Sequence, residues 1–295
     1  MSNKILIIGG SGLIGRYLAS NFRHEKNFVG IVARHIAEMD SQENIQADTT
    51  KEGLWSEKIR DYEIIINLAG ATIGKRWNRK YKEEIINSRI LTTKNIVAGI
   101  SKSQILFNAS AVGYYGNCGE KILTEDEPSK DDFLSKLCKM WEDEALVAKN
   151  KGAQVYIMRF GIVASRDGGA FTKLIKNHKL LLGSVLGNGK QYFSSIHIED
   201  LFNAIKFLID KRPDESIFNF TMPNPVTNRE LTYTISGILK RPIIIPFIPS
   251  FLLRLVLGEF SETLLFSQRA IPKRLTEAGY KFKFSQIEEI IKDVI

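Results

Sequence analysis

The chain has 295 residues, of which 44% are hydrophobic and 25% charged, as in an ordinary soluble globular protein. Its net charge of +8 indicates either an anionic ligand or a solvated basic surface, and no RNA- or DNA-binding motif accompanies it, so we expect no nucleic-acid partner. The two cysteines, Cys118 and Cys138, have no Cys or His at metal-ligand spacing. They fit a reducing cytoplasm, so we expect neither a disulfide scaffold nor a metal site.

The first predicted element is a short apolar strand that leads into a glycine-rich turn and then a helix. Only glycine lets a backbone turn so tightly and approach a pyrophosphate, and the following helix begins with unpaired N–H groups that favour an anion. Two glycine spacings coexist in this turn. Gly10, Gly12 and Gly15 fit G-x-G-x-x-G, whereas Gly9, Gly12 and Gly15 fit G-x-x-G-x-x-G, and later motifs favour the second spacing. We therefore predict a dinucleotide-binding turn made of Gly9, Ser11, Gly12, Leu13, Ile14 and Gly15.

Strand and helix patterns then alternate through the first half of the chain. Their near-continuous apolar strands are typical of a parallel sheet that is buried on both faces. The predicted strands are 28–33, 45–48, 64–70, 104–109 and 154–163, and the predicted helices are 80–100 and 132–149. This pattern predicts an α/β fold, a Rossmann doubly wound parallel sheet in residues 1–165. A strand near 216–221 should return to that sheet, while 166–295 should mostly form a smaller C-terminal substrate lobe.

Residues 242–257 are conspicuously apolar. Pro246 and Pro249 interrupt the run and Arg254 ends its most apolar stretch, so we expect no membrane span and no membrane partner. The segment fits either a buried strand and helix of the substrate lobe or a dimer surface. The N-terminus has no signal-peptide pattern, because the first strand begins at once. We therefore expect a cytoplasmic protein.

The residue after the second strand of a doubly wound sheet meets the adenosine ribose. An acidic residue there favours NAD, whereas an arginine accommodates the 2′-phosphate of NADP. This chain has Arg34 at that position, which predicts NADP. Asp48, at the end of the third strand, fits either an adenine contact or a plain turn residue. The small residues at the end of the fourth strand should let the cofactor pass close to the backbone, and they are Leu68, Ala69 and Gly70.

Motifs along nearly the whole chain resemble one family. The shared motifs include Asn67–Gly70, Arg76-Trp77-Asn78, Ser110–Gly116, Trp141-Glu142, Arg159–Val163, Arg166–Ala170, Ser194–Leu201, Pro223–Asn228 and Pro272–Leu275. The chain is similar to the extended short-chain dehydrogenase/reductases known as YfcH-like or epimerase-family proteins. This resemblance implies a Rossmann domain with bound NADP and a C-terminal lobe of the sugar-nucleotide epimerase type.

The resemblance also shows where this chain departs from the wider superfamily. Short-chain dehydrogenases use an Asn, Ser, Tyr and Lys tetrad, in which the tyrosine exchanges a proton while hydride passes at the nicotinamide. Ser110 stands at the serine position, but Leu134 and Cys138 stand at the positions of the tyrosine and lysine. Arg89 stands at the asparagine position, where a fixed positive charge would bind phosphate or an anionic substrate. Cys138 is a nucleophile in principle, although a buried structural cysteine fits better because no base is adjacent in sequence.

The family resemblance also implies roles for several further residues. Tyr114 or Tyr115 could replace the missing acid, and we favour Tyr114, with Ser110 and Tyr114 as the catalytic candidates. Glu84 fits a bond to the cofactor or to Arg89, or equally a solvated helix surface. Cofactor contacts are also expected from Phe160, Gly161 and Ile162, beside the nicotinamide. Arg76 and Trp77 either hold an anionic, aromatic substrate or simply pack their loop.

Two functions of different classes remain. The first is an NADP-dependent oxidoreductase or epimerase of atypical mechanism that acts on a small-molecule substrate, with an anionic one favoured by Arg89. The second is a sensor or regulatory protein that binds NADP(H) without chemistry, which the loss of the Tyr–Lys pair would explain. Extended family members often pair through the helices predicted here at 80–100 and 132–149, so a homodimer through them is a candidate assembly.

Overall fold

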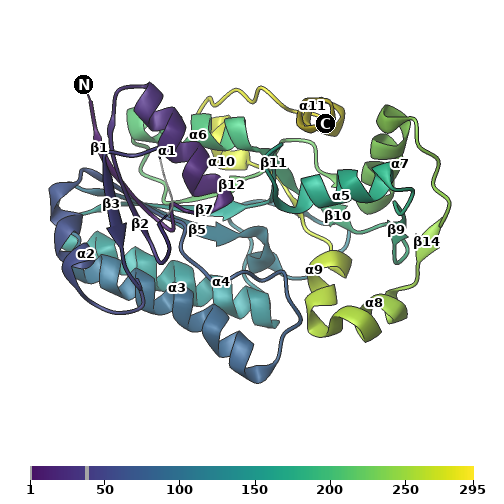
Figure 1. Ribbon diagram of the computed structural model, residues 1–295, viewed down its shortest axis with the longest axis horizontal. Coiled ribbons are helices and arrows are strands. Elements are labelled where there is room, and N and C mark those ends of the chain that lie inside the picture. The colour runs from purple at the N-terminus through teal and green to yellow at the C-terminus, as the bar shows by residue number, and fades with distance from the viewer. Residues whose placement is uncertain (1, 37–39) are drawn as a thin grey trace.

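The computed structural model describes residues 2–36 and 40–295. Its centre is a seven-stranded parallel sheet in the order β12-β7-β5-β4-β1-β2-β3 (Figure 1). This order confirms the predicted doubly wound Rossmann sheet, including the returning strand. The strands are β1 (Lys4–Ile8), β2 (Phe28–Ala33), β3 (Glu43–Gln46), β4 (Ile64–Asn67), β5 (Ile105–Ala111), β7 (Gln154–Phe160) and β12 (Ile217–Phe220).

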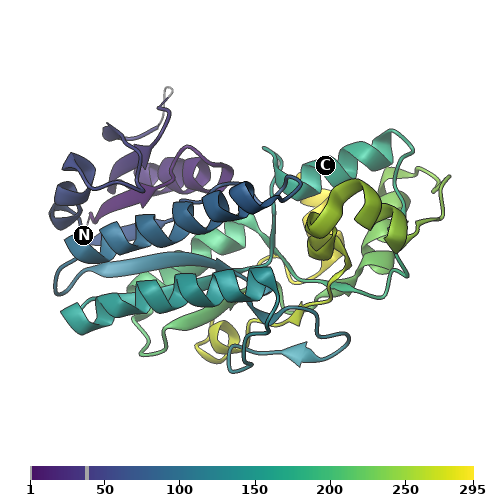
Figure 2. The same cartoon turned by 90° about the horizontal axis from the view of Figure 1, so that it is seen from below.

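Helices cover both faces of this sheet, which explains its apolar strands. On β1, Ile5 and Ile7 belong to one core cluster while Leu6 and Ile8 belong to the other, because successive side chains point to opposite faces. Figure 2 shows two of the helices running side by side along the sheet. One layer contains α1 (Leu13–His24), α6 (Ile198–Lys211) and α10 (Lys273–Glu277), and the other contains α2 (Leu54–Glu57), α3 (Arg79–Gly99) and α4 (Phe133–Leu146).

The structure changes two details of the predicted strands that matter for the site. Ser110 was expected just after the fifth strand, but β5 runs to Ala111 and includes it. The predicted strand 154–163 is two strands, because β7 ends at Phe160 and β8 (Ile162–Ala164) pairs with β11 (Ser195–His197) instead. At the break, a Cβ on Gly161 would lie 2.5 Å from the carbonyl oxygen of Ser194. The chain therefore changes sheets where two backbone segments are in close contact.

A third core holds the other end of the molecule together. It contains Phe171, Ile235 and Ile290 from three helices. These helices are α5 (Gly169–Lys179), α7 (Asn228–Leu239) and α11 (Ile287–Val294). Two pairs of short strands complete this part of the chain: β9 (Val185–Leu186) with β14 (Phe247–Ile248), and β10 (Tyr192–Phe193) with β13 (Val226–Thr227). A third pair, β6 (Ile122–Leu123) with β15 (Arg269–Ala270), belongs to a separate small core with Val112 and Tyr115. Helices α6 and α10 come from the second half of the chain but lie on the main sheet, so the predicted Rossmann domain and C-terminal lobe interleave. The predicted domain boundary at residue 165 remains a prediction.

The apolar segment 242–257 is not a buried strand and helix, which was one of the two structures expected for it, and the other, a dimer surface, remains untested. It forms β14 and α8 (Ser250–Leu257), followed by α9 (Glu262–Leu265). On α8 only Leu253 is buried, because the other apolar side chains point away from the protein. No helix among residues 2–36 and 40–295 is both long and apolar enough to cross a bilayer.

Candidate functional site

Three hollows follow one another along the carboxyl ends of the central strands. We call them the Arg34 pocket, the Gly12 pocket and the Ser110 pocket, each after a residue that lines it, and their volumes are about 240, 320 and 400 Å³. Leu68 lines all three. They therefore form one continuous groove at the edge where doubly wound sheets bind their ligands.

The glycine turn forms the middle of the groove. Gly9 has φ +82°, and a Cβ there would lie 2.8 Å from the backbone nitrogen of Ala69. A Cβ on Gly15 would lie 2.5 Å from Cα of Gly10. On Gly12 it would meet only the Gly9 carbonyl oxygen, at 3.4 Å, and otherwise point into open space. Gly9 and Gly15 are thus needed for the fold itself, whereas Gly12 keeps room for a ligand at the start of α1.

Basic groups line the far end of the groove. Arg34 and His35, at the end of β2, line the Arg34 pocket together with Asp48. Asp48 accepts hydrogen bonds from the Thr50 hydroxyl at 2.8 Å and the Thr50 backbone nitrogen at 3.2 Å, and the hydroxyl bond is the main reason that its pKa is lowered. Asp48 is therefore a turn residue that also lines the pocket. The position that meets the adenosine ribose carries Arg34 and not a carboxylate, and Asp48 accepts its hydrogen bonds from Thr50, so the Arg34 side of this pocket is suited to an anionic group.

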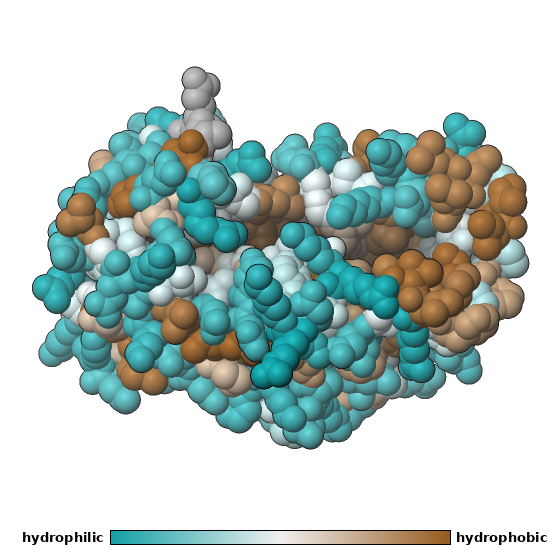
Figure 3. All heavy atoms as spheres, turned by 60° about the horizontal axis from the view of Figure 1, so that its bottom comes forward, coloured by the Kyte–Doolittle hydropathy of each residue, from teal (hydrophilic) through white to brown (hydrophobic). Residues whose placement is uncertain are grey.

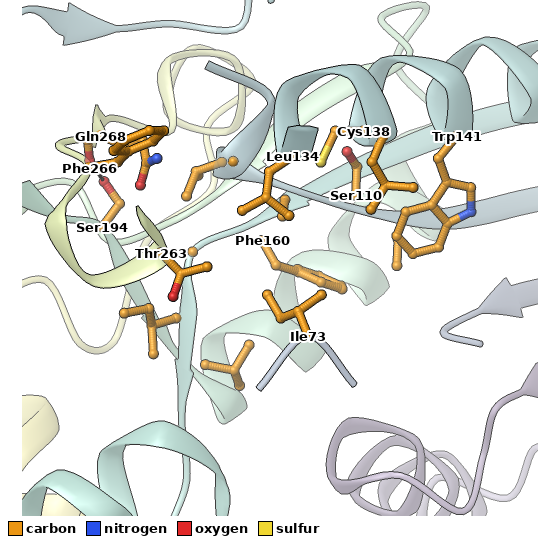
Figure 4. A pocket seen from close by; sticks show the side chains of 18 of the residues that line it. Ile73, Ser110, Leu134, Cys138, Trp141, Phe160, Ser194, Thr263, Phe266 and Gln268 are labelled. Atoms are coloured by element: carbon orange, nitrogen blue, oxygen red, sulfur yellow. Dashed lines mark hydrogen bonds between the residues drawn. The ribbon is translucent and has the colours of Figure 1, made fainter. Parts of the chain in front are cut away.

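The Ser110 pocket is built from both halves of the chain. Ser110 on β5 and Leu134 and Cys138 on α4 line one side, and residues of the C-terminal segment line another (Figure 4). The C-terminal residues are Thr263, Phe266 and Gln268. Most of the lining is apolar, and the polar groups are few and separate. Such a cavity fits a ligand with an apolar body held by a small number of polar contacts.

Arg89 brings a positive charge to this pocket. Its Nη1 donates to the carbonyl oxygens of Ala71 and Ile85, both at 3.1 Å, and its Cζ lies 5.1 Å from the centre of the Trp141 ring. A Cβ on Gly70 would lie 2.8 Å from that Cζ, so the guanidinium packs directly against this glycine. Burial lowers the pKa of Arg89. No carboxylate in the described part of the chain forms an ion pair with Arg89, and Arg89 lines the Ser110 pocket, so its charge is available to a ligand there.

Ser110 is held in place by a buried ion pair. Its Oγ donates to Oε1 of Glu142 at 2.6 Å. Arg159 donates to both oxygens of the same carboxylate, from Nε at 2.9 Å and Nη2 at 2.8 Å. Both charged side chains are almost fully buried, and Ser110 and Arg159 are register partners on β5 and β7. Because its proton is committed to Glu142, Ser110 faces the pocket as a hydrogen-bond acceptor.

The same arginine ties the ion pair to the next strand. Arg159 Nη1 donates to the Tyr115 hydroxyl at 2.9 Å, and that hydroxyl donates to Oδ1 of Asn219 at 2.7 Å. Asn219 on β12 is in turn the register partner of Arg159. Burial disfavours the charged guanidinium, but the Glu142 carboxylate outweighs this effect and holds the pKa of Arg159 above its usual value. Glu142 and Arg159 therefore stay charged inside the protein, and the polar side chains beside them are all hydrogen-bonded.

The structure brings most of the predicted cofactor residues together. Every one of them lines a pocket of the groove except Glu84, which is exposed on α3. In the Arg34 pocket these are Gly9, Ser11, Gly12, Arg34, Leu68, Ala69 and Gly70; in the Gly12 pocket Leu13, Ile14 and Gly15; and in the Ser110 pocket Arg89, Phe160, Gly161 and Ile162. Arg89 bonds backbone carbonyls and not Glu84, so the predicted role of Glu84 has no support.

The structure does not place Tyr114 in the Ser110 pocket. The Cζ of Arg159 lies 3.5 Å from the centre of the Tyr114 ring, which stacks on the buried guanidinium, and Tyr115 is fully buried. Trp77 is also packed, against Phe133, so it does not present its ring to a substrate. The tyrosine that does line the pocket is Tyr192, whose place in the second half gave no signal in the sequence.

Cys138 lines the pocket but is a poor nucleophile. It is buried, and burial, followed by the nearby Glu142 carboxylate, raises the pKa of its thiol to about 12. A thiol with this pKa stays protonated at neutral pH. This agrees with the structural role that the sequence favoured.

The ion pair itself went unpredicted, although the sequence holds a signal for it. Arg159 lies in the largely apolar strand β7, and a charged residue inside a central strand needs a buried partner. Glu142 lies on the buried face of α4. Neither residue belongs to the usual Asn, Ser, Tyr and Lys tetrad, so only their burial indicates that they form a pair.

The glycines make a sharp test of the groove. Gly15→Ala should lower the free energy of unfolding by about 1–3 kcal/mol, because the new Cβ collides with the Gly10 backbone. Gly12→Ala should cost less than about 1 kcal/mol and yet weaken NADPH binding by more than about tenfold, since the new methyl group fills the groove. Urea denaturation and fluorescence titration measure the two quantities. Unchanged NADPH binding by the folded Gly12 variant would contradict the proposed contact.

The ion pair predicts unequal effects on stability. Glu142→Ala leaves the Arg159 guanidinium buried without its carboxylate and should reduce the free energy of unfolding by about 3–5 kcal/mol. Ser110→Ala removes one hydrogen bond and keeps the pair, so it should cost about 1 kcal/mol. Urea denaturation of both variants gives the comparison. Similar small losses in the two would show that the pair does not hold this part of the sheet.

Comparison with known proteins agrees with this geometry. Residues 5–220 match the NAD dependent epimerase/dehydratase family, and residues 248–294 match a domain of unknown function, DUF1731. The human epimerase family protein SDR39U1 (isoform 2), whose crystal structure was determined with NADPH, has a TM-score of 0.87 and is 27% identical, with 99% of this chain and 98% of that chain covered.

Curated relatives extend the match over the full length. An epimerase family protein of Staphylococcus haemolyticus, SH2119, is 35% identical, and the alignment covers 99% of both chains. The chloroplastic SDR39U1 homologue of Arabidopsis thaliana is 32% identical over 99% of this chain and 86% of its own. The chain therefore belongs to the NAD-dependent epimerase/dehydratase family, as an atypical extended short-chain dehydrogenase/reductase related to SDR39U1.

Proposed function

We propose that this protein binds NADP(H) and uses it as an oxidoreductase or epimerase on a small substrate with an apolar body. The observation that carries the proposal is the arrangement of the groove: the Arg34 pocket and the Gly12 pocket adjoin each other and the cavity beside Ser110, and Leu68 lines all three. The NADPH of the human SDR39U1 structure supports the choice of cofactor. When bound, the cofactor would supply hydride transfer at its nicotinamide.

The bound cofactor would extend through all three pockets, with a different part of it in each. Arg34 would hold the 2′-phosphate, and the start of α1 at Gly12 would receive the pyrophosphate. Phe160 and Gly161 would lie beside the nicotinamide. The room left by Gly12 fits the pyrophosphate of either dinucleotide, whereas Arg34 in place of a carboxylate fits NADP(H) better than NAD(H).

Ser110 and Arg89 would orient the substrate. Ser110 can accept a hydrogen bond from a substrate hydroxyl, because its own proton goes to Glu142. Arg89 would offer a fixed charge to a carboxylate or another anionic group. Since Tyr114 stacks on Arg159, Tyr192 replaces it as the candidate that exchanges the proton.

A second candidate function rests on Leu134 and Cys138. They put apolar groups where the family's usual tyrosine and lysine would stand, as a protein that only senses NADP(H) would allow. An apolar plug against the nicotinamide would favour that sensor. The structure has a cavity of about 400 Å³ at this place, which favours an enzyme.

The cofactor preference can be tested at Arg34. Arg34→Ala should weaken NADPH binding about 10- to 100-fold, because a charge-assisted contact to the 2′-phosphate contributes about 1.5–3 kcal/mol. NADH has no such phosphate, so its affinity should change little. Fluorescence titration measures both, and Arg60→Ala, an exposed arginine away from the groove, is the matched control. Equal losses for NADPH and NADH would refute this role of Arg34.

Catalysis can be tested with the purified protein, NADP⁺ and a panel of alcohols that have an apolar body, because Ser110 can accept a hydrogen bond from the substrate hydroxyl. We expect NADP⁺ reduction with at least one compound, and about a hundredfold loss of kcat in Ser110→Ala and in Tyr192→Phe, with the NADPH affinity kept. The same losses in Tyr114→Phe, whose ring only stacks on Arg159, would contradict the assignment to Tyr192. No turnover with any compound, and no effect of Ser110→Ala, would favour the sensor.

A further inference from the structure

The face around α8 combines exposed apolar side chains from two distant segments. Val185 on β9 pairs with Phe247 on β14 in parallel, so the residues just before each strand lie at the same end. A Cβ on Gly187, after β9, would come within 3.9 Å of Cβ of Ser250, at the start of α8. We call this face the Phe251 surface. Its large apolar side chains are each more than half exposed and are Leu182, Ile244, Phe247, Phe251, Leu255 and Val256.

Space-filling spheres make the extent of the Phe251 surface visible. Brown, hydrophobic spheres gather at the right-hand end of the molecule in Figure 3, the end at which α8 and β14 lie in Figure 1. Teal, hydrophilic spheres lie among and around them (Figure 3). Contiguous exposed apolar patches with a polar rim mark interaction surfaces in soluble proteins.

The net positive charge of the protein lies in the same two segments. Residues 168–198 and 231–258 contain no Asp or Glu, and their basic residues supply seven of the eight net positive charges of the chain. All seven are exposed, and among the residues that the structure describes none of them forms an ion pair. They are Lys173, Lys176, Lys179, Lys190, Lys240, Arg241 and Arg254.

We propose that the Phe251 surface docks on a lipid bilayer that contains anionic phospholipids. Such a bilayer is complementary in both respects, because the apolar side chains enter the boundary between headgroups and acyl chains while Lys240, Arg241 and Arg254, which flank or lie among them in the chain, meet anionic headgroups. A second copy of this chain is a poorer partner. A twofold interface would bring the same positive charges against themselves, without a carboxylate in either segment to offset them.

Docking here would bring the pocket close to the bilayer. Thr263 lines the Ser110 pocket and follows α8 by only a few residues. Between them, Glu259 forms an ion pair with Lys82 on α3, which fixes the connection between α8 and the pocket. The proposal departs from the expectation that the protein meets no membrane. That expectation was drawn from the prolines that prevent residues 242–257 from spanning a bilayer, and they do not prevent contact with its surface.

Co-sedimentation with vesicles tests the proposal on the full-length protein. We expect binding to vesicles of phosphatidylcholine with phosphatidylglycerol and little binding to phosphatidylcholine alone. The double variant Phe251→Ser/Leu255→Ser should bind more than about tenfold more weakly, because two apolar side chains no longer leave water. Lys240→Gln/Arg241→Gln should lose about fivefold for each charge removed, and salt near 1 M should reduce binding by the wild type.

Matched controls separate this surface from general stickiness. Leu91→Ser and Lys94→Gln remove an exposed apolar side chain and an exposed charge on α3, and they should bind as the wild type does. Circular dichroism and NADPH titration show that each variant is folded. Absence of binding to anionic vesicles would overturn the proposal, as would equal losses in the α3 controls. A wild-type dimer on size-exclusion chromatography that Phe251→Ser/Leu255→Ser dissociates would identify a contact between copies and refute it as well.

Discussion

The ion pair between Glu142 and Arg159 is the constraint on which the candidate site depends. It lies inside the protein, where an unpaired charge would be very costly, so α4 and β7 must keep both partners in contact. Ser110 reaches the pair directly, and Asn219 reaches it through Tyr115. One interaction thus fixes the serine at the pocket and connects it to the returning strand. The Ser110 hydroxyl donates its hydrogen bond to this buried carboxylate, so only its acceptor side is left for a ligand in the pocket.

Where the sequence predicted well, local pattern and packing agreed. The alternation of apolar strands with helices gave the sheet, because strands that are buried on both faces have few other compositions. The glycine turn gave the middle of the groove, since Gly9 and Gly15 each face a backbone segment that leaves no room for a side chain. These features depend on short stretches of sequence and on one general rule of packing, and so a single chain was enough to predict them.

The errors share another cause, which is contact between segments far apart in the chain. Tyr114 follows Ser110 closely in sequence, but Arg159 from another strand binds its ring and keeps it out of the pocket. Tyr192 lines the pocket although it lies in the loosely patterned second half. Composition correctly marked residues 242–257 as apolar and could not decide whether another element covers them. The fold leaves most of α8 uncovered, and that outcome depends on the whole lobe.

The nucleotide end of the groove and the Ser110 pocket are built from different parts of the chain. Specificity for the cofactor and specificity for the substrate therefore depend on different residues. Residues before Arg89 form nearly all of the nucleotide end, while Phe266 and Gln268 of the C-terminal segment help to close the Ser110 pocket. Changes in that segment can alter which substrate fits without disturbing the glycine turn or Arg34. The same segment begins just after the exposed apolar face of α8. A substrate with an apolar body would then be consistent with both the lining of the pocket and the surface that surrounds its C-terminal wall.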